Sequence, residues 1–538
     1  MVNDENMREL VKTESVCPEC LKILPATVFE RDGKVWIKKT CKEHGEFEDL
    51  YSGSYEWYAR AARYAKDGKG VENPQVTKDA PICPKDCGLC RLHLNHSALA
   101  NIVLTNRCDL TCWYCFFYAG RAGYVYEPSL KEIDEMAGTL RSERPIACNA
   151  VQLTGGEPCL REDLVDIIKL VKSRGIDHVQ LNTNGIRLAQ DPELVEQVRA
   201  AGVNTLYLSF DGVSEKTNPK NHWEVPQTIE NCRKAGLGIV LVPTVINSVN
   251  DHEVGDILKF GFKNIDIIRG VNFQPVSLVG RMPREERERY RITIPDVIKR
   301  IEEQTDGEIR TEDFFSVPTA MVISNFIEAL AKRPMYDISS HFACGAVTYV
   351  FQDNGRLVPL TRFIDVDGFL EYLGEKSQEL KAGKSKFLVG TKLLYSIRKF
   401  IDKEKKPKGL DLDKILFNAF VKHDYDAIGK FHIKSLFIGM MHFMDLYNYD
   451  IERVKRCCIH YAMTDRRIIP FCAFNVIPEW YRDKTQESQG VSFEGWETKT
   501  GRKLKSELYK RDVEKLKSSP AYKKFVEQVE GIKARAAA

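Results

Sequence analysis

The sequence of 538 residues lacks three features that would assign it to common classes of protein. It has almost no excess charge, with 79 Lys and Arg residues against 76 Asp and Glu residues and a net charge of +3, so no general attraction to nucleic acid is expected. It has no apolar run of 18 residues that could cross a membrane. It begins with polar and acidic residues rather than the apolar core of a signal peptide. We therefore expect a soluble, cytoplasmic protein of roughly two to four domains.

Cysteine, by contrast, is plentiful, and most of the 16 cysteines lie in short clusters. The cytosol keeps thiols reduced, so such clusters indicate metal sites rather than disulfides. The first cluster has Cys17 and Cys20, followed about twenty residues later by Cys41 and His44. This spacing is typical of a tetrahedral site for zinc or one iron, and it leaves the metal open. We interpret the metal as structural rather than electron-transferring, because roughly fifty residues have too small a core to fold alone.

Two further clusters share the spacing CxxxCxxC. They are Cys83, Cys87 and Cys90, and Cys108, Cys112 and Cys115. Three thiolates at this spacing can hold three irons of a [4Fe–4S] cluster and leave the fourth iron open. A zinc site or a disulfide loop is the alternative, but zinc sites favour paired CxxC motifs and disulfides suit short secreted chains.

Six apolar runs, separated by segments with a helical pattern, predict an α/β fold. The predicted strands are 100–105, 150–154, 179–182, 205–210, 239–243 and 267–273. One intervening segment, 162–171, has apolar residues at i, i+3 and i+4, as an amphipathic helix does. Alternating strands and helices indicate a parallel sheet with helical crossovers.

The Cys108 motif follows the first of these strands, Tyr114 precedes its third cysteine, and Gly155–Pro158 reads GGEP after the second strand. These features resemble the signature of the radical S-adenosylmethionine (SAM) superfamily. The resemblance implies a partial (β/α)6 barrel with its site at the carboxyl ends of the strands. It also implies that Cys108, Cys112 and Cys115 hold a [4Fe–4S] cluster, whose open iron binds SAM for cleavage to a 5′-deoxyadenosyl radical.

The resemblance also separates the two CxxxCxxC motifs. The superfamily places its catalytic loop after a strand, as at Cys108, whereas no strand precedes Cys83 and its motif contains Pro84 and Gly88. We therefore assign Cys83, Cys87 and Cys90 to an auxiliary [4Fe–4S] cluster. Either His93 or His96 could complete that cluster, although a lone histidine is more often a hydrogen-bonded core residue.

Polar and glycine residues at the strand ends match positions that bind SAM in this superfamily. They are Tyr114, Gly155, Gly156, Glu157, Pro158, Asn182, Asn184, Ser209, Asp211, Thr244 and Gln274. The glycines would let the backbone approach the ligand, and Glu157 would offer an acceptor to the SAM ammonium. Each residue taken alone is more typical of an ordinary turn at the end of a strand.

Four cysteines in the C-terminal half are enough for a second auxiliary cluster. They are Cys344, Cys457, Cys458 and Cys472. Buried free cysteines that serve only packing are the alternative, and Cys458 is the weakest candidate because adjacent cysteines rarely ligate one cluster. We favour the cluster, since C-terminal extensions of this superfamily often close one.

The motifs divide the chain into four expected parts. Residues 1–75 form a rubredoxin-like or zinc-ribbon-like metal domain with a linker, 76–99 an auxiliary-cluster segment, 100–280 the radical SAM barrel, and 281–538 a mostly α C-terminal extension. Within the extension, apolar segments at 415–420 and 436–444 are interpreted as helical. The second has apolar residues on more than one helix face, so it is either buried core or the wall of a channel for a long alkyl chain.

Over nearly its full length the sequence resembles the archaeal tetraether lipid synthases of the superfamily. The resemblance implies hydrogen abstraction from the terminal methyl groups of the isoprenoid (phytanyl) chains of archaeol-type diether phospholipids, followed by C–C coupling to tetraether lipids. The implied partners are a long-chain isoprenoid lipid substrate, an electron donor such as ferredoxin or flavodoxin and, transiently, a membrane surface that the protein meets peripherally. No nucleic acid partner is implied.

Two alternatives remain open from the sequence. The same group of sequences has been interpreted as a radical SAM methyltransferase that acts on a dihydropterin in methanopterin biosynthesis. A pterin needs a short polar pocket and a phytanyl chain needs an apolar tunnel roughly 20 Å long, and the apolar content of 415–444 favours the lipid. An iron–sulfur electron carrier is the third hypothesis, but it leaves the GGEP motif unexplained.

Overall fold

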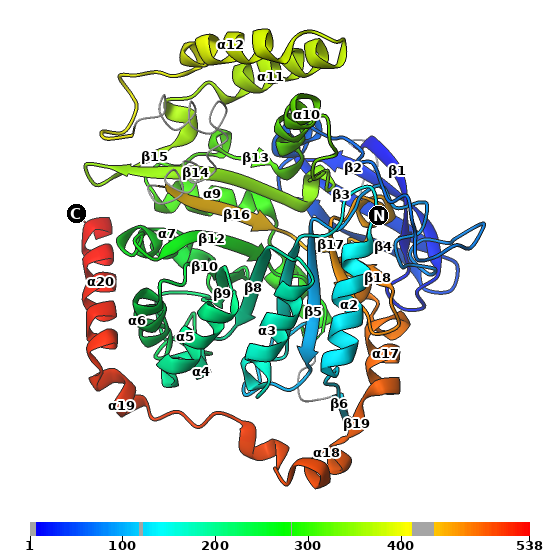
Figure 1. Ribbon diagram of the computed structural model, residues 1–538, viewed down its shortest axis with the longest axis vertical. Helices are drawn as coiled ribbons and strands as arrows, with labels where there is room; N and C mark the ends of the chain where they lie inside the picture. The colour runs from blue at the N-terminus through cyan, green and yellow to red at the C-terminus, as the bar shows by residue number, and fades with distance from the viewer. Residues whose placement is uncertain (1–6, 118–121, 281, 411–434, 538) are drawn as a thin grey trace.

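The computed structural model describes residues 7–117, 122–280, 282–410 and 435–537. These residues form three sheets: a four-stranded antiparallel sheet at the N-terminus, a 13-stranded mixed sheet that contains the barrel strands, and a two-stranded sheet of residues 124–125 and 491–492. Figure 1 shows the N-terminal sheet against one edge of the large sheet. Among the described residues, no helix is both long and apolar enough to cross a membrane.

The N-terminal sheet consists of four consecutive strands in the order β1-β2-β3-β4. Their bounds are β1 Arg8–Val16, β2 Ile23–Arg31, β3 Lys34–Cys41 and β4 Gly45–Ser52, followed by α1 Tyr55–Ala62. Antiparallel neighbours need only short turns. Cys17 and Cys20 lie in the turn between β1 and β2, and Cys41 is the last residue of β3. The helix α1 follows β4 directly and is capped by the Ser54 side chain.

The six predicted barrel strands are present, adjacent and parallel, which confirms the α/β fold class. They are β5 Leu99–Thr105, β7 Ala150–Gly155, β8 His178–Thr183, β9 Thr205–Ser209, β10 Ile239–Val242 and β12 Ile268–Pro275. Parallel strands require crossover connections, which place the helices on the outer face of the sheet. The connecting helices are α2 Leu130–Ser142, α3 Leu164–Ser173, α4 Ile186–Gln190, α5 Pro192–Ala201, α6 Val225–Ala235 and α7 Val254–Lys263.

The amphipathic pattern of these helices accounts for the packing of the outer layer. In α3 the apolar residues Leu164, Ile167, Ile168 and Val171 are all buried, as the period of 3.6 residues requires. They belong to the same core as Leu153 of β7 and Leu181 of β8. The strands thus turn one face toward the helices and the other into the barrel.

The C-terminal half extends the same sheet at both edges. β16 Ser435–Met441 pairs in parallel with β12 and antiparallel with β14 Gly345–Asp353, while β17 Ile459–Ala462 pairs in parallel with β5. The helical interpretation of 436–444 is therefore wrong, because most of it is the strand β16 (Figure 1). A strand buried on both faces is apolar at every position and cannot be told from a buried helix by its sequence period. The segment 415–420 lies outside the described residues.

Smaller strands and further helices complete the described fold, and helices predominate after β18. The remaining strands are β6 Tyr124–Val125, β11 Thr244–Val245, β13 Phe315–Ser316, β15 Arg356–Pro359, β18 Ile468–Pro470 and β19 Val491–Ser492. The remaining helices are α8 Arg287–Tyr290, α9 Ile294–Gln304, α10 Ala320–Ala331, α11 Val366–Lys381, α12 Lys386–Ser396, α15 Ile451–Lys455, α16 Phe471–Val476, α17 Arg482–Gln489, α18 Phe493–Thr500, α19 Val513–Ser518 and α20 Pro520–Ala537.

The last fifty residues wrap around the barrel rather than standing apart from it. Figure 1 shows this segment running along the lower edge of the sheet, from α18 to α20 beside α6 and α7. Glu507 forms a buried ion pair at 2.6 Å with Arg107, the residue that precedes Cys108. The Tyr509 N–H donates to the Asp109 carbonyl at 3.0 Å. The tail therefore holds the loop that carries the Cys108 motif.

Candidate active site

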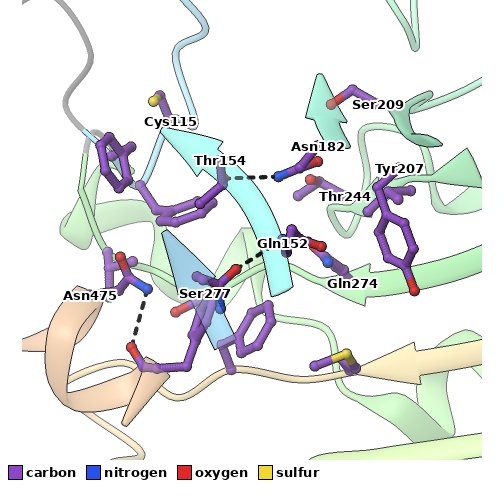
Figure 2. Close-up of a pocket in the computed structure, with 18 of the residues that line it drawn as sticks. Cys115, Gln152, Thr154, Asn182, Tyr207, Ser209, Thr244, Gln274, Ser277 and Asn475 are labelled. Carbon is purple, nitrogen blue, oxygen red and sulfur yellow. Dashed lines mark hydrogen bonds between the residues drawn. The ribbon is translucent and has the colours of Figure 1, made fainter. Parts of the chain in front are cut away.

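A cavity of about 220 Å³ opens at the carboxyl ends of the barrel strands and reaches into the barrel interior. Its walls come from the Cys108 loop, from β7 to β12 and from C-terminal segments near β16 and α16. Figure 2 shows Thr154, Asn182, Ser209 and Gln274 around it. Active sites of (β/α) barrels occupy this end of the strands.

All three cysteines of the Cys108 motif line this cavity. The loop brings their thiols close enough for Cys115 to raise the pKa of both Cys108 and Cys112. Burial is the main cause of both shifts, and it raises the pKa of Cys112 to about 11. A buried thiol becomes a thiolate only beside compensating positive charge, and thiolates are the ligands of iron–sulfur clusters. Three convergent thiols beside an open cavity fit such a cluster with one free iron.

The two glycines of the GGEP motif serve a close backbone contact. A Cβ atom on Gly155 would lie 2.2 Å from the Thr105 carbonyl oxygen, and one on Gly156 would lie 2.0 Å from that of Arg107. The Gly156 N–H donates to the Thr105 carbonyl at 2.8 Å. Both glycines line the cavity, as predicted, yet their closest constraint is the strand that carries the Cys108 loop.

Glu157 also has an internal role that the sequence did not indicate. Its carboxylate accepts hydrogen bonds from the Thr183 hydroxyl at 2.7 Å, the Asn184 N–H at 2.8 Å and the Cys159 N–H at 2.9 Å. Burial, followed by the nearby Asp109, raises its pKa to about 7. Glu157 therefore joins the ends of β7 and β8 and also lines the cavity, and its contact with the SAM ammonium stays a prediction.

A charged group behind Tyr114 contains a residue that the sequence analysis missed. Asp211 accepts a hydrogen bond from the Tyr114 hydroxyl and another from the Thr244 N–H at 2.9 Å. Lys220 forms an ion pair with Asp211 at 2.7 Å and lies over the Tyr114 ring. Lys220 lines the cavity and Asp211 does not. The ammonium group is thus the charged side chain placed to meet a carboxylate ligand.

Some of the other predicted strand-end residues line the cavity and others do not. Asn182, Asn184, Ser209, Thr244 and Gln274 line the cavity, whereas Pro158 does not. Asn184 also donates to the Asp109 carboxylate at 2.7 Å, which ties the Cys108 loop to the end of β8.

Polar side chains deeper in the barrel were missed by the sequence analysis. They are Asn101, Gln152, Thr154, Tyr207, Asn272, Ser277 and Asn475. Most occupy alternate positions of strands, as Gln152 and Thr154 do in β7. Polar residues at every second position of an otherwise apolar strand mark one face of it, and that alternation was the available signal. Asn475 lies in α16, far along the chain, and had no such signal.

Asn475 lines the cavity and has a buried side-chain oxygen. Its amide nitrogen donates to the Phe471 carbonyl at 3.1 Å and to the Tyr461 hydroxyl at 3.4 Å (Figure 2). Its Oδ1 atom is buried and, in the described part of the chain, has no hydrogen-bond partner. A buried acceptor without a partner costs free energy, so a ligand N–H is a suitable complement. Nearby, the rings of Phe443 and Phe471 stack with their centroids 4.0 Å apart.

The four C-terminal cysteines come together in space despite their separation in sequence. The Cys344 thiol raises the pKa of Cys458 and Cys472, and Cys472 raises that of Cys457, in each case after burial as the main cause. Cys472 also lines the cavity. The fold therefore places the proposed second auxiliary site against the same cavity as the Cys108 motif.

The thiols of Cys83 and Cys87 are buried, and burial raises the pKa of Cys83 to about 12. His93 donates from Nε2 to the Cys457 carbonyl at 2.8 Å, and His96 Nε2 accepts from the Asp337 N–H at 2.9 Å. Both bonds use Nε2 alone, and His96 Nδ1 has no hydrogen-bond partner among the described residues, so a histidine as the fourth ligand stays a prediction.

Tyr449 provides a test of whether these residues suit a cluster. Its hydroxyl is fully buried and has no hydrogen-bond partner among the described residues. Cys83, Cys87 and Cys472 are near enough to raise its pKa, after burial. The sulfur atoms of clusters on these cysteines would supply the missing acceptor, so the residues fit auxiliary iron–sulfur clusters.

The N-terminal metal site assembles as the spacing predicts. The ligand atoms of Cys17, Cys20, Cys41 and His44 all lie within 4.8 Å of one another. Backbone N–H groups and the His44 ring lower the pKa of Cys41 to about 6. Four converging side chains, including the Cys41 thiol with its lowered pKa, suit a single tetrahedral metal ion.

Two family models match the chain. Residues 102–261 match the radical SAM superfamily, and residues 10–53 match the "HMPTM N-terminal zinc ribbon domain". The second match covers the strands that hold the Cys17 site. Together they agree with the predicted barrel and metal domain.

Among curated proteins, the chain is 47% identical to a 7,8-dihydro-6-hydroxymethylpterin dimethyltransferase of Methanocaldococcus jannaschii, over 90% of this chain and 96% of that protein. It is 30% identical to the GTP 3′,8-cyclase of Aquifex aeolicus over 33% of this chain and 57% of that protein. The solved structure of methylornithine synthase (PylB) is 17% identical, covers 40% of this chain and 64% of that one, and has a TM-score of 0.29, too low to carry an argument.

The first of these similarities corrects the expected function. The sequence favours coupling of isoprenoid lipids, with pterin methylation as the alternative. A relative matched over nearly its whole length is a pterin dimethyltransferase, so the tetraether lipid synthase interpretation is contradicted. The apolar run used to support it is partly the sheet strand β16.

Proposed function

The chain belongs to the radical SAM superfamily, in the family of the M. jannaschii 7,8-dihydro-6-hydroxymethylpterin dimethyltransferase, and we propose that it is a radical SAM methyltransferase that acts on a dihydropterin. The 47% identity over 90% of the chain is the observation that carries the proposal. A radical SAM enzyme binds a [4Fe–4S] cluster and SAM, and the Cys17 group is an additional metal site.

The cavity lining supports a flat polar substrate. Amides and hydroxyls from five barrel strands and from α16 surround the space, and a pterin presents donors and acceptors along its edges. The unpartnered Oδ1 of Asn475 suits a ring N–H or an amino group. Phe443 and Phe471 offer aromatic faces on which a planar ring can stack.

The position of each group of cavity residues suggests its role in the proposed reaction. When bound, the cluster and SAM supply a 5′-deoxyadenosyl radical, which removes hydrogen from carbons that acid–base chemistry cannot open. Cys108, Cys112 and Cys115 would hold the cluster at the cavity wall, and Lys220 would bind the SAM carboxylate. The amides deeper in the barrel would orient the pterin, and the buried apolar wall around Phe471 would exclude water. An electron donor such as ferredoxin or flavodoxin would reduce the cluster.

The direct test is methyl transfer by the anaerobically reconstituted full chain. The protein would be incubated with SAM, a low-potential reductant and 7,8-dihydro-6-hydroxymethylpterin, and the pterin analysed by mass spectrometry. We expect a mass gain of one or two methyl groups, absent from the Cys108→Ala variant. No mass gain, together with hydrogen loss from an archaeol phospholipid in a parallel reaction, would overturn the proposal.

We also propose the four-part division at residues 75, 99 and 280 and a cytoplasmic location. The zinc-ribbon match at 10–53 and the radical SAM match at 102–261 fall within the first and third parts. All 16 cysteines are free thiols in the structure, which suits a reducing compartment. Limited proteolysis that cut inside the barrel before any of these boundaries would contradict the division.

Peripheral contact with an anionic membrane surface is a further part of the proposal, and α12 supports it. Phe387, Leu388 and Tyr395 lie on one face of this helix and are 79%, 59% and 78% exposed. The stretch from Lys381 to Lys408 has ten basic and two acidic residues, a net charge of +8. Aromatic residues among lysines suit an interface between anionic lipid head groups and acyl chains.

Vesicle flotation tests this contact. The chain should float with vesicles that contain phosphatidylglycerol and stay behind with phosphatidylcholine alone. The double variant Phe387→Ser, Tyr395→Ser should lose flotation, while Thr391→Ser on the same helix should keep it. Equal behaviour of the double variant and the unaltered chain, or binding to nucleic acid in place of vesicles, would overturn the contact.

A further inference from the structure

Four arginines are buried in the part of the chain that the structure describes, and one of them differs from the rest. They are Arg107, Arg291, Arg453 and Arg482. A buried guanidinium needs a compensating negative charge, because desolvation of an isolated charge is costly. Three of the four meet this need with carboxylates. The fourth, Arg453, does not.

The three conventional cases have carboxylates close by. Arg107 pairs with Glu507 and Glu127, each at 2.6 Å, and Arg482 pairs with Asp483 at 2.9 Å. Arg291 lies between Asp49, at 2.9 Å, and Asp445. In each case charge is balanced within the protein itself.

Arg453, in α15, is 2% exposed and pairs with no carboxylate among the described residues. Its Nε donates to the Cys344 sulfur at 3.2 Å, and one terminal nitrogen donates to the His442 carbonyl at 2.7 Å. The guanidinium carbon lies 5.5 Å from the centre of the Tyr51 ring. The carbonyl and the ring are neutral, so the sulfur is the contact that can carry charge.

The nearby acidic residues Glu452 and Asp450 already have other partners, and Glu452 pairs with Lys455 at 2.7 Å. The Asp450 carboxylate accepts hydrogen bonds from the Thr13 and Tyr51 hydroxyls, each at 2.7 Å. Cys472, by contrast, lies close enough for Arg453 to lower its pKa against the effect of burial. Arg453 therefore faces two of the four C-terminal cysteines, Cys344 and Cys472.

We propose that Arg453 is a positioning residue for the second auxiliary cluster, where it balances the negative charge of the cluster and its thiolates and donates a hydrogen bond to the Cys344 ligand. A cluster held by four thiolates carries net negative charge, which gains one further unit on reduction. Hydrogen bonds to ligand sulfur and nearby positive charge favour the reduced form. The reduction potential of this cluster is thus higher with Arg453 than without it.

This inference depends on Cys344, Cys457, Cys458 and Cys472 holding a cluster and not on which substrate the enzyme takes. Its test therefore needs no substrate. A redox titration followed by electron paramagnetic resonance would report the midpoint potential of each cluster. A Cys472→Ala variant, whose spectrum lacks the C-terminal signal, identifies that signal in the unaltered protein.

The Arg453→Gln variant should reduce this cluster at least tenfold less favourably, a fall of about 59 mV for one electron. Arg453→Lys, which keeps the charge, should show a smaller fall. Lys455→Gln is the matched control, because it removes a positive charge from the same helix and its ammonium pairs instead with Glu452 at 2.7 Å. It should leave the C-terminal signal unchanged.

Each outcome decides the inference. If the reduction equilibrium of the cluster changes by less than tenfold in Arg453→Gln, the inference is overturned. If Arg453→Gln fails to retain the cluster, iron and sulfide counts on Arg453→Lys decide instead. Retention by the lysine variant supports a role for the charge, whereas loss in both variants, with Lys455→Gln intact, shows that the shape of arginine is required for packing and overturns the inference.

Discussion

The Cys17 site and the Cys108 loop both collect thiols, yet the fold prepares them in opposite ways. At the Cys17 site four ligand atoms lie within 4.8 Å, and backbone N–H groups lower the pKa of Cys41 to about 6. In the Cys108 loop burial raises the pKa of Cys112 to about 11, and the thiols line an open cavity. A single ion needs ligands that already converge, whereas a cluster brings its own positive charge and leaves one corner for a substrate.

The number of cysteines alone does not define a site in this chain. The Cys17 group has no open position for chemistry once a tetrahedral ion is bound. The Cys108 group supplies three ligands and faces Lys220 and the polar strand ends. The two groups of cysteines therefore differ in geometry: one converges on a point, and the other lines an open cavity.

The largest expected effect is the loss of radical formation in Cys108→Ala. Outer contacts of metal ligands are worth about 10- to 100-fold, so removal of a ligand should lower 5′-deoxyadenosine formation by more than about 100-fold. Chromatography of the SAM reaction measures it. Cys232→Ala, a buried thiol in α6, is the matched control and should keep full activity. Normal product from Cys108→Ala would reassign the catalytic cluster.

The second-largest effect is expected at the Cys17 site, when Cys41 is removed. Cys41→Ala should lose one metal ion per chain and lower the midpoint of thermal unfolding by several degrees, because the ion closes a small sheet with little core. Formation of 5′-deoxyadenosine per folded molecule should persist. Lys42→Ala, on the neighbouring exposed side chain, should change neither quantity. A folded Cys41→Ala protein without activity would indicate electron transfer through this site.

Lys220 tests whether the cavity charge serves SAM. A hydrogen bond to a charged group contributes about 1.5 to 3 kcal/mol, so Lys220→Met should raise the KM for SAM about tenfold or more. Steady-state kinetics with varied SAM measures it, and Lys216→Met, an exposed lysine nearby, is the control. If the KM stays constant while stability falls, Lys220 serves Asp211 alone.

The smallest expected effect is a change in the pH dependence of stability, which depends on the burial of Glu143 and involves no metal site. Burial raises the pKa of Glu143 to about 7, so the folded state holds its proton to higher pH than the unfolded state. Stability from this group is therefore greatest below about pH 4.5 and falls as the pH rises to about 7, by about 3 kcal/mol. Glu143→Gln should flatten this dependence.

Thermal unfolding of both proteins between pH 5 and pH 8 measures the difference. The amide introduced by Glu143→Gln adds a constant cost at every pH, since Glu143 Oε1 has no partner among the described residues, so only the slope is compared. Equal slopes would show that the Glu143 carboxyl is not the group responsible.

Local patterns in the sequence predicted much of this molecule. The convergence of Cys17, Cys20, Cys41 and His44, the six parallel strands and the grouping of the Cys108 motif were all predictable. Each depends on neighbours within one turn, strand or strand–helix unit. Spacing within a few residues restricts which side chains can meet. Most of the predicted SAM-binding residues also line the cavity, because parallel strands end at one edge.

Tertiary structure alone decided the remainder. The strand β16 reads as a helix in sequence, since burial on both faces removes the alternation that marks a strand. Asn475 and Lys220 reach the cavity from helical and loop segments with no periodic signal. Arg453 and Cys344 lie 109 residues apart in sequence, yet they are in contact. Contacts across such separations depend on how whole elements pack, and the sequence shows only what each element is made of.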